Sequence, residues 1–138
     1  LDAGLPYAAS LFPSAPAHGG SPCPPGIHNL TTPAGQTLRE LPMSSMSLCG
    51  KRLAFSGGGY LRVLPWGMIQ RGMAQCERAG RPAVVYLHPW DFAADSPVPA
   101  MSRWHRFRCY HGRAGAAEKL RKLLSGWRWG TCAEAMGL

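Results

Sequence analysis

The chain has 138 residues, a net charge of +8, and many turn-forming residues, with 17 Gly and 13 Pro. This length suits a single domain with its own core, so we take residues 1–138 as one domain. No apolar run is long enough to span a bilayer. Five widely spaced Cys without a Cys-x-x-Cys pair argue against a disulfide framework and a structural zinc site.

The positive charge is concentrated in the last quarter of the chain, where residues 103–138 carry a net +6. Such a tail can bind nucleic acid, anionic lipid or an anionic polymer, but no RNA-binding or helix-turn-helix signature accompanies it. We therefore favour a solvated helix face and expect no specific nucleic-acid partner. The sequence starts with Leu and shows no signal peptide, and we expect it to be a piece of a longer protein.

The first half of the chain is predicted to be rich in loops. Residues 14–37 are dense in Pro, Gly, Ser and Thr, which predicts one long loop. Residues 38–48 alternate only partially, which predicts a strand near 38–41 and a second extended piece to residue 48. Pro42 indicates a break or an edge position between them.

Three consecutive glycines at positions 57–59 precede Tyr60 and Arg62. Glycine permits backbone conformations, and a close approach of ligands, that other residues exclude. The segment is therefore either a tight turn that enters a helix or a loop in which Tyr60 and Arg62 contact a substrate. It matches a phosphate-binding loop poorly, because no Lys-Ser/Thr pair follows.

Residues 64–78 predict a helix that begins near Pro65 and ends at Gly80. Four residues fall at helical spacing on one face of it. They are Trp66, Ile69, Met73 and Cys76.

Residues 83–88, Ala-Val-Val-Tyr-Leu-His, predict a strand that is buried on both faces. A helix followed by such a strand is half of a parallel βα repeat. His88 lies at the C-terminal end of the predicted strand, and this end carries the active site in α/β barrels. The alternative is a structural histidine whose ring is satisfied by backbone groups.

Residues 100–112 interleave aromatic residues with arginines, which suits either the binding of sugars or nucleic acid, or a short helix packed on the domain. We favour the packed helix. Residues 114–126 predict a helix in which Glu118 and Lys122 form an i,i+4 pair and the basic residues face solvent. The predicted apolar stripe comprises Ala117, Leu120, Leu123, Leu124 and Trp127.

Three motifs follow one another along the chain: Glu-Leu-Pro-Met-Ser at 40–44, Gly-Gly-Gly-Tyr-Leu-Arg at 57–62, and Arg-Pro-Ala-Val-Val-Tyr-Leu-His-Pro-Trp at 81–90. Together they resemble the C-terminal region of bacterial polysaccharide deacetylases of the carbohydrate esterase 4 class, from exopolysaccharide and exosortase loci. The resemblance continues to the final helix and spans nearly the whole chain. Because cysteines without a disulfide framework suit a reducing compartment, we expect a location in the bacterial cytoplasm, with association with the cell envelope as the alternative.

This resemblance implies an α/β fold, the C-terminal part of a distorted (β/α)7-type barrel with a C-terminal helix. It also implies hydrolysis of N-acetyl groups on an N-acetylated polysaccharide built from amino sugars. In that class a divalent metal, commonly zinc, polarises the acetyl carbonyl and activates water. Its Asp-His-His ligand set belongs to the N-terminal half, so we expect no metal ligand in residues 1–138 and no activity of the isolated chain.

His88 takes over the role of the acid that protonates the leaving amine in the family, and Leu87 would border the acetyl methyl group. Tyr60, Arg62 and Trp90 are the other predicted substrate-binding residues. Two departures from the family pattern stand out. Ala8 replaces a carboxylate of a Tyr-Asp-Ser-Ser motif, and Asp91 replaces a Glu.

Two alternatives to the enzyme stay open. The first is a non-catalytic module that binds a glycan or polyanion through the aromatic residues and arginines at 60–62 and 104–113. The second is an inactive fragment, which the replacement at Ala8 would favour.

Overall fold

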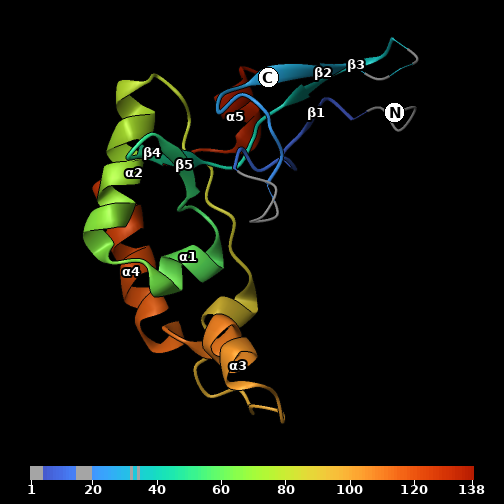
Figure 1. Cartoon of the computed structure of the whole chain (residues 1–138). Helices are drawn as coiled ribbons and strands as arrows, with labels where there is room; N and C mark the ends of the chain where they lie inside the picture. Colours follow the sequence, from blue (N-terminus) through green and yellow to red (C-terminus); the bar gives the residue numbers. More distant parts are fainter. Residues whose placement is uncertain (1–4, 15–19, 32, 34) are drawn as a thin grey trace.

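The computed structural model describes residues 5–14, 20–31, 33 and 35–138 of a mixed α/β chain. A group of helices and a β-hairpin form the body of the molecule, residues 45–127. A three-stranded sheet and the described residues around it form an arm, residues 5–14, 20–31, 33 and 35–44, which extends to one side of the body (Figure 1).

The arm consists of β1 (Tyr7–Ala8), β2 (His28–Thr31) and β3 (Thr37–Glu40), in the order β1-β3-β2. β1 runs parallel to β3, and β2 runs antiparallel to it. β3 confirms the strand predicted near 38–41. The prediction of one continuous loop over 14–37 is wrong at β2, because four residues of pairing are too short to leave a pattern in the sequence. Residues 15–19, 32 and 34 of that loop lie outside the described part of the chain.

A second sheet is the hairpin of β4 (Ser45–Leu48) and β5 (Lys51–Ala54). Cys49 and Gly50 form its two-residue turn, and both have a positive φ, 48° and 74°, as a twisted hairpin turn requires. β4 confirms the second extended piece, and residues 41–44, which belong to no strand, confirm the break at Pro42. β5 was not predicted, since its sequence Lys-Arg-Leu-Ala lacks an alternating apolar face.

Two helices follow the hairpin, α1 (Gly58–Val63) and α2 (Trp66–Arg78). α2 confirms the predicted helix: it starts after Pro65, and Gly80 with φ 61° follows its end. α1 starts within the three glycines, so they form a turn into a helix. The ammonium of Lys119 donates to three carbonyl oxygens at the end of α1, those of Leu61, Arg62 and Leu64, at 2.8–3.1 Å. Burial there lowers the pKa of Lys119.

The apolar core lies between the hairpin, α1, α2 and α4. Its buried members are Met46, Phe55, Leu61, Ile69, Met73, Cys76 and Leu123. A Cβ on Gly72 would stand 2.7 Å from the ring of Phe55, so glycine there allows α2 to pack closely. Burial raises the pKa of the Cys76 thiol, although Arg81 acts against this shift.

The chain ends with α3 (Arg103–Tyr110), α4 (Arg113–Gly126) and α5 (Cys132–Met136). α4 confirms the predicted helix, and Glu118 pairs with Lys122 at 3.8 Å. The predicted stripe is confirmed at Leu120, Leu123 and Trp127, which pack in or against the core, and is wrong at Leu124, which is 54% exposed. Arg113 and Ala116 are the other buried residues of α4. In the described part of the chain, no helix is long and apolar enough to cross a membrane.

Candidate functional site

A broad, open cavity of about 1050 Å³ lies between the start of α1, residues 86–91 and α3. Four of the five predicted site residues line it: Tyr60, Arg62, His88 and Trp90. Leu87 is absent from its lining and packs against the apolar core instead. The fold thus joins the glycine motif and the Tyr-Leu-His-Pro-Trp motif in one site, although about 25 residues separate them in the sequence.

Residues 83–88 are not the doubly covered strand that the sequence predicted. The segment meets its neighbour in a single parallel bridge between Gly57 and Tyr86. The N–H of Gly58 donates to the carbonyl of Tyr86 at 2.9 Å, and the N–H of Tyr86 donates to the carbonyl of Ser56 at 3.0 Å. No named strand pairs with this segment among the described residues, and Tyr86 is exposed. The apolar composition was a correct indicator of extended backbone, but the described residues do not cover both faces.

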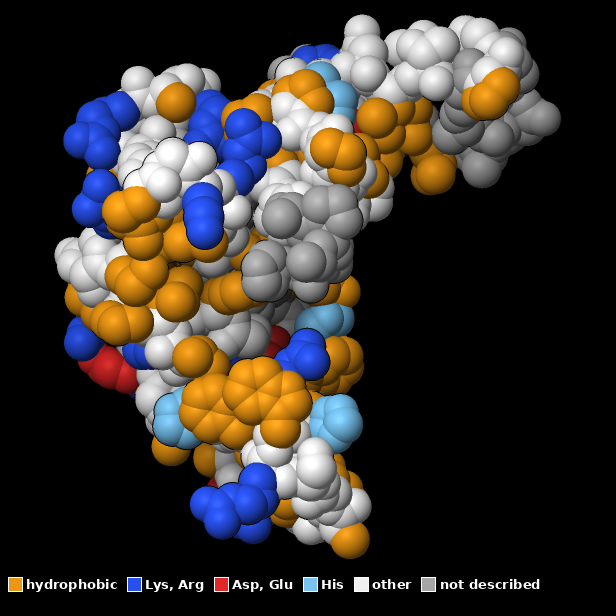
Figure 2. Space-filling view, viewed as in Figure 1, with side chains coloured by type: hydrophobic (Ala, Val, Ile, Leu, Met, Phe, Trp, Pro, Cys, Tyr) orange, Lys and Arg blue, Asp and Glu red, His pale blue; other side chains and the backbone are white. Residues whose placement is uncertain are grey.

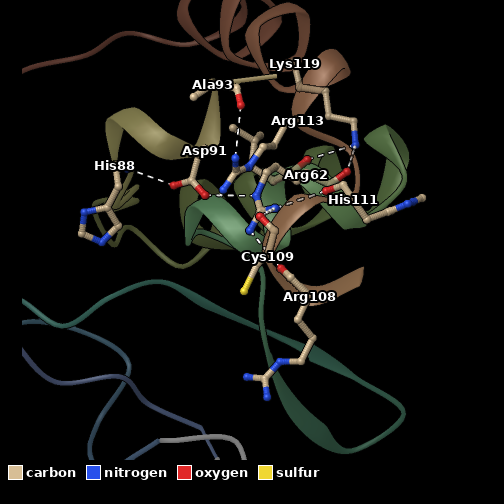
Figure 3. A network of polar contacts seen from close by, with 10 residues as sticks. Arg62, His88, Asp91, Ala93, Arg108, Cys109, His111, Arg113 and Lys119 are labelled. Carbon is tan, nitrogen blue, oxygen red and sulfur yellow. Dashed lines mark hydrogen bonds and ion pairs between the residues drawn. The ribbon is translucent and has the colours of Figure 1, made fainter. Parts of the chain in front are cut away.

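His88 directly precedes a short 3-10 helix, η2 (Pro89–Asp91). Its backbone N–H donates to Oδ2 of Asp91 at 3.0 Å. The imidazole ring stacks on Trp90 with ring centres 3.9 Å apart and meets the edge of Tyr86 at 4.4 Å. It points away from Asp91 and Arg62 (Figure 3). The main chain of His88 is therefore fixed by a buried carboxylate, while its ring lies in the cavity wall.

Asp91 is the centre of the polar network behind the cavity (Figure 3). Its Oδ1 lies 3.0 Å from Nε of Arg62, and both side chains are almost fully buried, at 3% and 6% exposure. A Cβ built on Gly58 would overlap the Asp91 carboxylate, so any other residue at position 58 would displace it. The close approach that the glycines permit is thus made by a carboxylate of the protein itself.

Arg62 also holds the C-terminal end of α3. Its Nη1 donates to the carbonyl oxygens of Cys109 at 2.8 Å and His111 at 3.3 Å, and its Nη2 donates to that of Arg108 at 3.2 Å. A cation is favourable at this end of a helix, where carbonyls lack partners. Gly112, with φ 77°, follows α3, and a Cβ there would overlap the carbonyl of Arg62. The guanidinium of Arg62 is therefore directed to protein acceptors.

The third wall of the cavity is α3, and none of its residues is buried. Trp104 is 65% exposed and Phe107 is 41% exposed. Their rings stack on one another, with centres 6.0 Å apart and planes 14° apart, and Phe107 stacks on His111 at 4.6 Å. Figure 2 shows a broad apolar patch with histidines beside it in this region. α3 therefore confirms the short helix expected within residues 100–112, whereas the expectation that its aromatic residues pack it on the domain is wrong for Trp104 and Phe107.

Sequence reasoning assigned no functional role to Asp91, and it did not assign these aromatic residues to the same cavity as His88. A signal for α3 was present, because Trp104, Phe107, Arg108 and His111 follow i, i+3, i+4, i+7 spacing. That spacing defines a helix face but does not tell whether the face is buried or exposed.

Within the ranges that the structure describes, no group of three or more His, Cys, Asp or Glu side chains could hold a metal ion. Asp91, the carboxylate closest in sequence to His88, is engaged by Arg62 and by the backbone of His88. All five cysteines are free thiols. The described residues therefore offer no site of their own for a metal ion.

A family model described as a domain of unknown function (DUF3473) matches residues 9–137. The match includes the body, every residue of the cavity wall and the arm apart from its first residues with β1. In comparisons with curated proteins and with solved structures, nothing matches the chain.

Proposed function

The chain belongs to the DUF3473 family, and we propose that it forms the C-terminal part of a metal-dependent N-deacetylase that acts on the amino-sugar polymers of an exopolysaccharide. In this proposal His88 is the proton donor to the leaving amine. The observation that carries the proposal is the position of the His88 imidazole in the wall of a large open cavity, with its main chain anchored on buried Asp91.

Hydrolysis of an acetamide needs a proton on the departing nitrogen, because an unprotonated amine anion is a very poor leaving group. Histidine suits this task, since its ordinary pKa lies near neutrality. Trp90 beside it is 54% exposed and offers a flat apolar face to a sugar ring. Tyr60 lines the same cavity, and Arg62 would serve the site by holding Asp91 and α3 in place.

The extended segment at 83–88 supports the barrel in this proposal. Its apolar, β-branched sequence suits a central strand, yet the described residues pair it at a single bridge. Strands of a metal-binding portion outside residues 1–138 would complete the (β/α)7-type barrel along this edge. The divalent metal, commonly zinc in the class that the chain resembles, would be held by that portion, because the described residues form no site for it.

The test is the replacement His88→Ala in the protein that the complete gene encodes. Acetate release from N-acetylated amino-sugar oligosaccharides and bound metal are measured on the same preparations. We expect kcat to fall about 10²- to 10⁴-fold, the usual contribution of a general acid, with bound metal unchanged. The matched control is His28→Ala on β2, outside the cavity lining, which should keep the wild-type rate. Unchanged acetate release in the His88 variant would remove this residue from the mechanism.

A second candidate is a glycan-binding module without catalysis, favoured by the exposed stack of Trp104 and Phe107. It predicts that residues 1–138 are retained on immobilised exopolysaccharide without added metal. It also predicts that any acetate released by the complete protein is unaffected by His88→Ala.

A further inference from the structure

α3 presents a flat aromatic surface to the cavity. Trp104 and Phe107 both line it, and their rings are nearly parallel, 14° apart. Large exposed aromatic surfaces are uncommon on soluble proteins and usually mark a binding site. Across the cavity, His88 stacks on Trp90 and meets the ring of Tyr86 edge to face, which gives a second group of aromatic rings. Two aromatic walls of this kind suit a chain of sugar rings, whose faces are apolar and whose edges carry hydroxyl groups.

The charge beside this surface is positive and unneutralised. Arg103, Arg106 and Arg108 on α3 are exposed, and none of them forms an ion pair within the described residues. Asp91, the acidic residue of the cavity lining, is already neutralised by Arg62. An anion that enters the cavity therefore meets guanidinium groups without a competing carboxylate of the protein. Arg108 is placed best among them, because it lines the cavity directly.

The density of free charge in the cavity is low. Of its three lining arginines, Arg62 is paired with Asp91, and Arg113 donates to the carbonyl of Ala93 at 3.1 Å and lies 4.1 Å from the centre of the Tyr110 ring. Only Arg108 among them is left for a ligand. A nucleic acid carries a phosphate on every nucleotide, and its binding sites usually follow the backbone with several cations. One free guanidinium beside stacked rings fits a polymer with an occasional carboxylate better.

The helix is also held in place before any ligand binds. Arg62 fixes its C-terminal carbonyls, and Ser102 caps its N-terminus by accepting the N–H of His105 at 3.3 Å. No residue of α3 is buried in the core, so its side chains are free to contact a ligand. A surface that is already positioned loses little conformational entropy on binding.

From these observations we propose that the face of α3 formed by Trp104, Phe107 and Arg108 binds acidic sugar units, so that the polymer recognised at this cavity is an anionic, uronate-containing polysaccharide. The aromatic pair stacks on sugar faces, and Arg108 pairs with a sugar carboxylate. This inference rests on the proposed function for the choice of a polysaccharide as the ligand. Its new element is that the polysaccharide is negatively charged.

The experiment measures binding of residues 1–138 to hyaluronan oligosaccharides, in which N-acetylglucosamine alternates with glucuronate, by isothermal titration calorimetry. The matched ligand is the same oligosaccharide with its carboxylates reduced to alcohols. We expect the reduced ligand to bind at least about tenfold more weakly, the usual effect of a lost charge-assisted pair. Trp104→Ala should weaken binding of both ligands by about tenfold, since stacking is independent of the carboxylate.

Arg108→Gln separates the charge from the stacking. It should weaken binding of the acidic ligand about tenfold and leave binding of the reduced ligand unchanged. The control Arg121→Gln removes an exposed arginine of α4 outside the cavity lining and should change neither. Circular dichroism of each variant checks that the helices are intact.

Equal affinities of the wild-type chain for the acidic and the reduced ligand would overturn the inference. Tighter binding of an oligothymidylate of equal charge would overturn it in favour of nucleic acid. Acetate release that depends on His88 but shows no preference for acidic polymers would also overturn it, while the proposed function would stand. Selective binding of the acidic ligand, lost in Arg108→Gln, would support it even if His88→Ala kept full activity.

Discussion

The body and the arm each contain a buried carboxylate, but the two groups are stabilised in different ways. In the body, Asp91 forms an ion pair with Arg62, next to an apolar core. In the arm, fully buried Glu40 forms no ion pair with a described residue. Its Oε1 accepts the backbone N–H groups of Ser10 at 2.8 Å and Leu11 at 2.6 Å, and its Oε2 accepts the Ser10 hydroxyl at 3.3 Å.

This difference shows what each carboxylate connects. Asp91 and Arg62 join α1, η2 and the end of α3, so they tie together elements that form the cavity. Glu40 joins the end of β3 to the segment that follows β1, so it acts within the arm. Arm and body then meet through side chains such as Arg81, which donates to the carbonyls of Pro25 and Ser45. Damage to the first network should reach the whole body, whereas damage to the second should stay local.

The largest expected effect is that of Arg62→Met. It leaves Asp91 buried without its cation and leaves the carbonyls at the end of α3 without a donor. Removing one partner of a buried ion pair typically lowers the free energy of unfolding by about 3–5 kcal/mol. Urea denaturation monitored by circular dichroism measures the loss. Arg121→Met, which removes an exposed partner of Glu118, should change stability by less than about 0.5 kcal/mol. Equal effects of the two variants would contradict the central role of the Asp91 pair.

A smaller effect is expected for Gly58→Ala, which tests the same network without removing a charge. The added methyl group overlaps the Asp91 carboxylate and should force it away from Arg62 and from the N–H of His88. Overpacking of this kind costs about 1–3 kcal/mol. The matched control is Gly67→Ala in α2, where an added Cβ would have no atom within 4 Å. Because alanine favours the helix more than glycine does, this variant should be more stable by about 0.5–1 kcal/mol. Thermal melting of both variants should show shifts of opposite sign; two shifts of equal sign would exclude this account of Gly58.

The smallest effect is expected for Glu40→Gln. The amide oxygen can still accept both backbone N–H groups, while the negative charge is lost and the Ser10 hydroxyl has to accept from the new NH2 group instead of donating. Because hydrogen bonds to charged groups are stronger than neutral ones, we expect a loss of about 1–2 kcal/mol. Hydrogen exchange should become faster at the amides of Ser10 and Leu11 and stay unchanged in α2. Faster exchange in both regions would show that arm and body unfold as one unit.

The sequence predicted the parts of the fold in which buried residues recur at the spacing of one helix face. α2 was found because Ile69, Met73 and Cys76 return to one face, and α4 was found for the same reason, with Leu124 placed on the wrong side. β2 and β5 were missed, since strands of four residues with mixed burial leave no clear alternation. Residues 83–88 were predicted as a strand covered on both faces because their side chains are almost all apolar. An apolar composition shows that a segment favours burial, but it does not show which part of the protein covers it, and the described residues pair this segment at a single bridge.

Four of the five predicted site residues lie at one cavity, but Leu87 does not, and the contacts among them were not predicted. Tyr60, Arg62, His88 and Trp90 share one cavity, as the two motifs indicated. The pairing of Arg62 with Asp91 could not be predicted. A glycine such as Gly58 indicates that another group approaches the backbone closely, but the sequence does not identify that group as the Asp91 carboxylate. The exposure of Trp104 was hidden for a related reason: the same helical spacing describes a face that packs and a face that binds.

The way Arg62 holds α3 has a consequence for the evolution of the family. Its guanidinium contacts carbonyl oxygens of the main chain, which every amino acid provides, and no side chain of α3 is buried. Substitutions along the exposed face of this helix therefore meet little selection for stability. The residues at 104, 107 and 108 can therefore be replaced at little cost in stability while Arg62, Asp91 and Gly112 keep the helix in position.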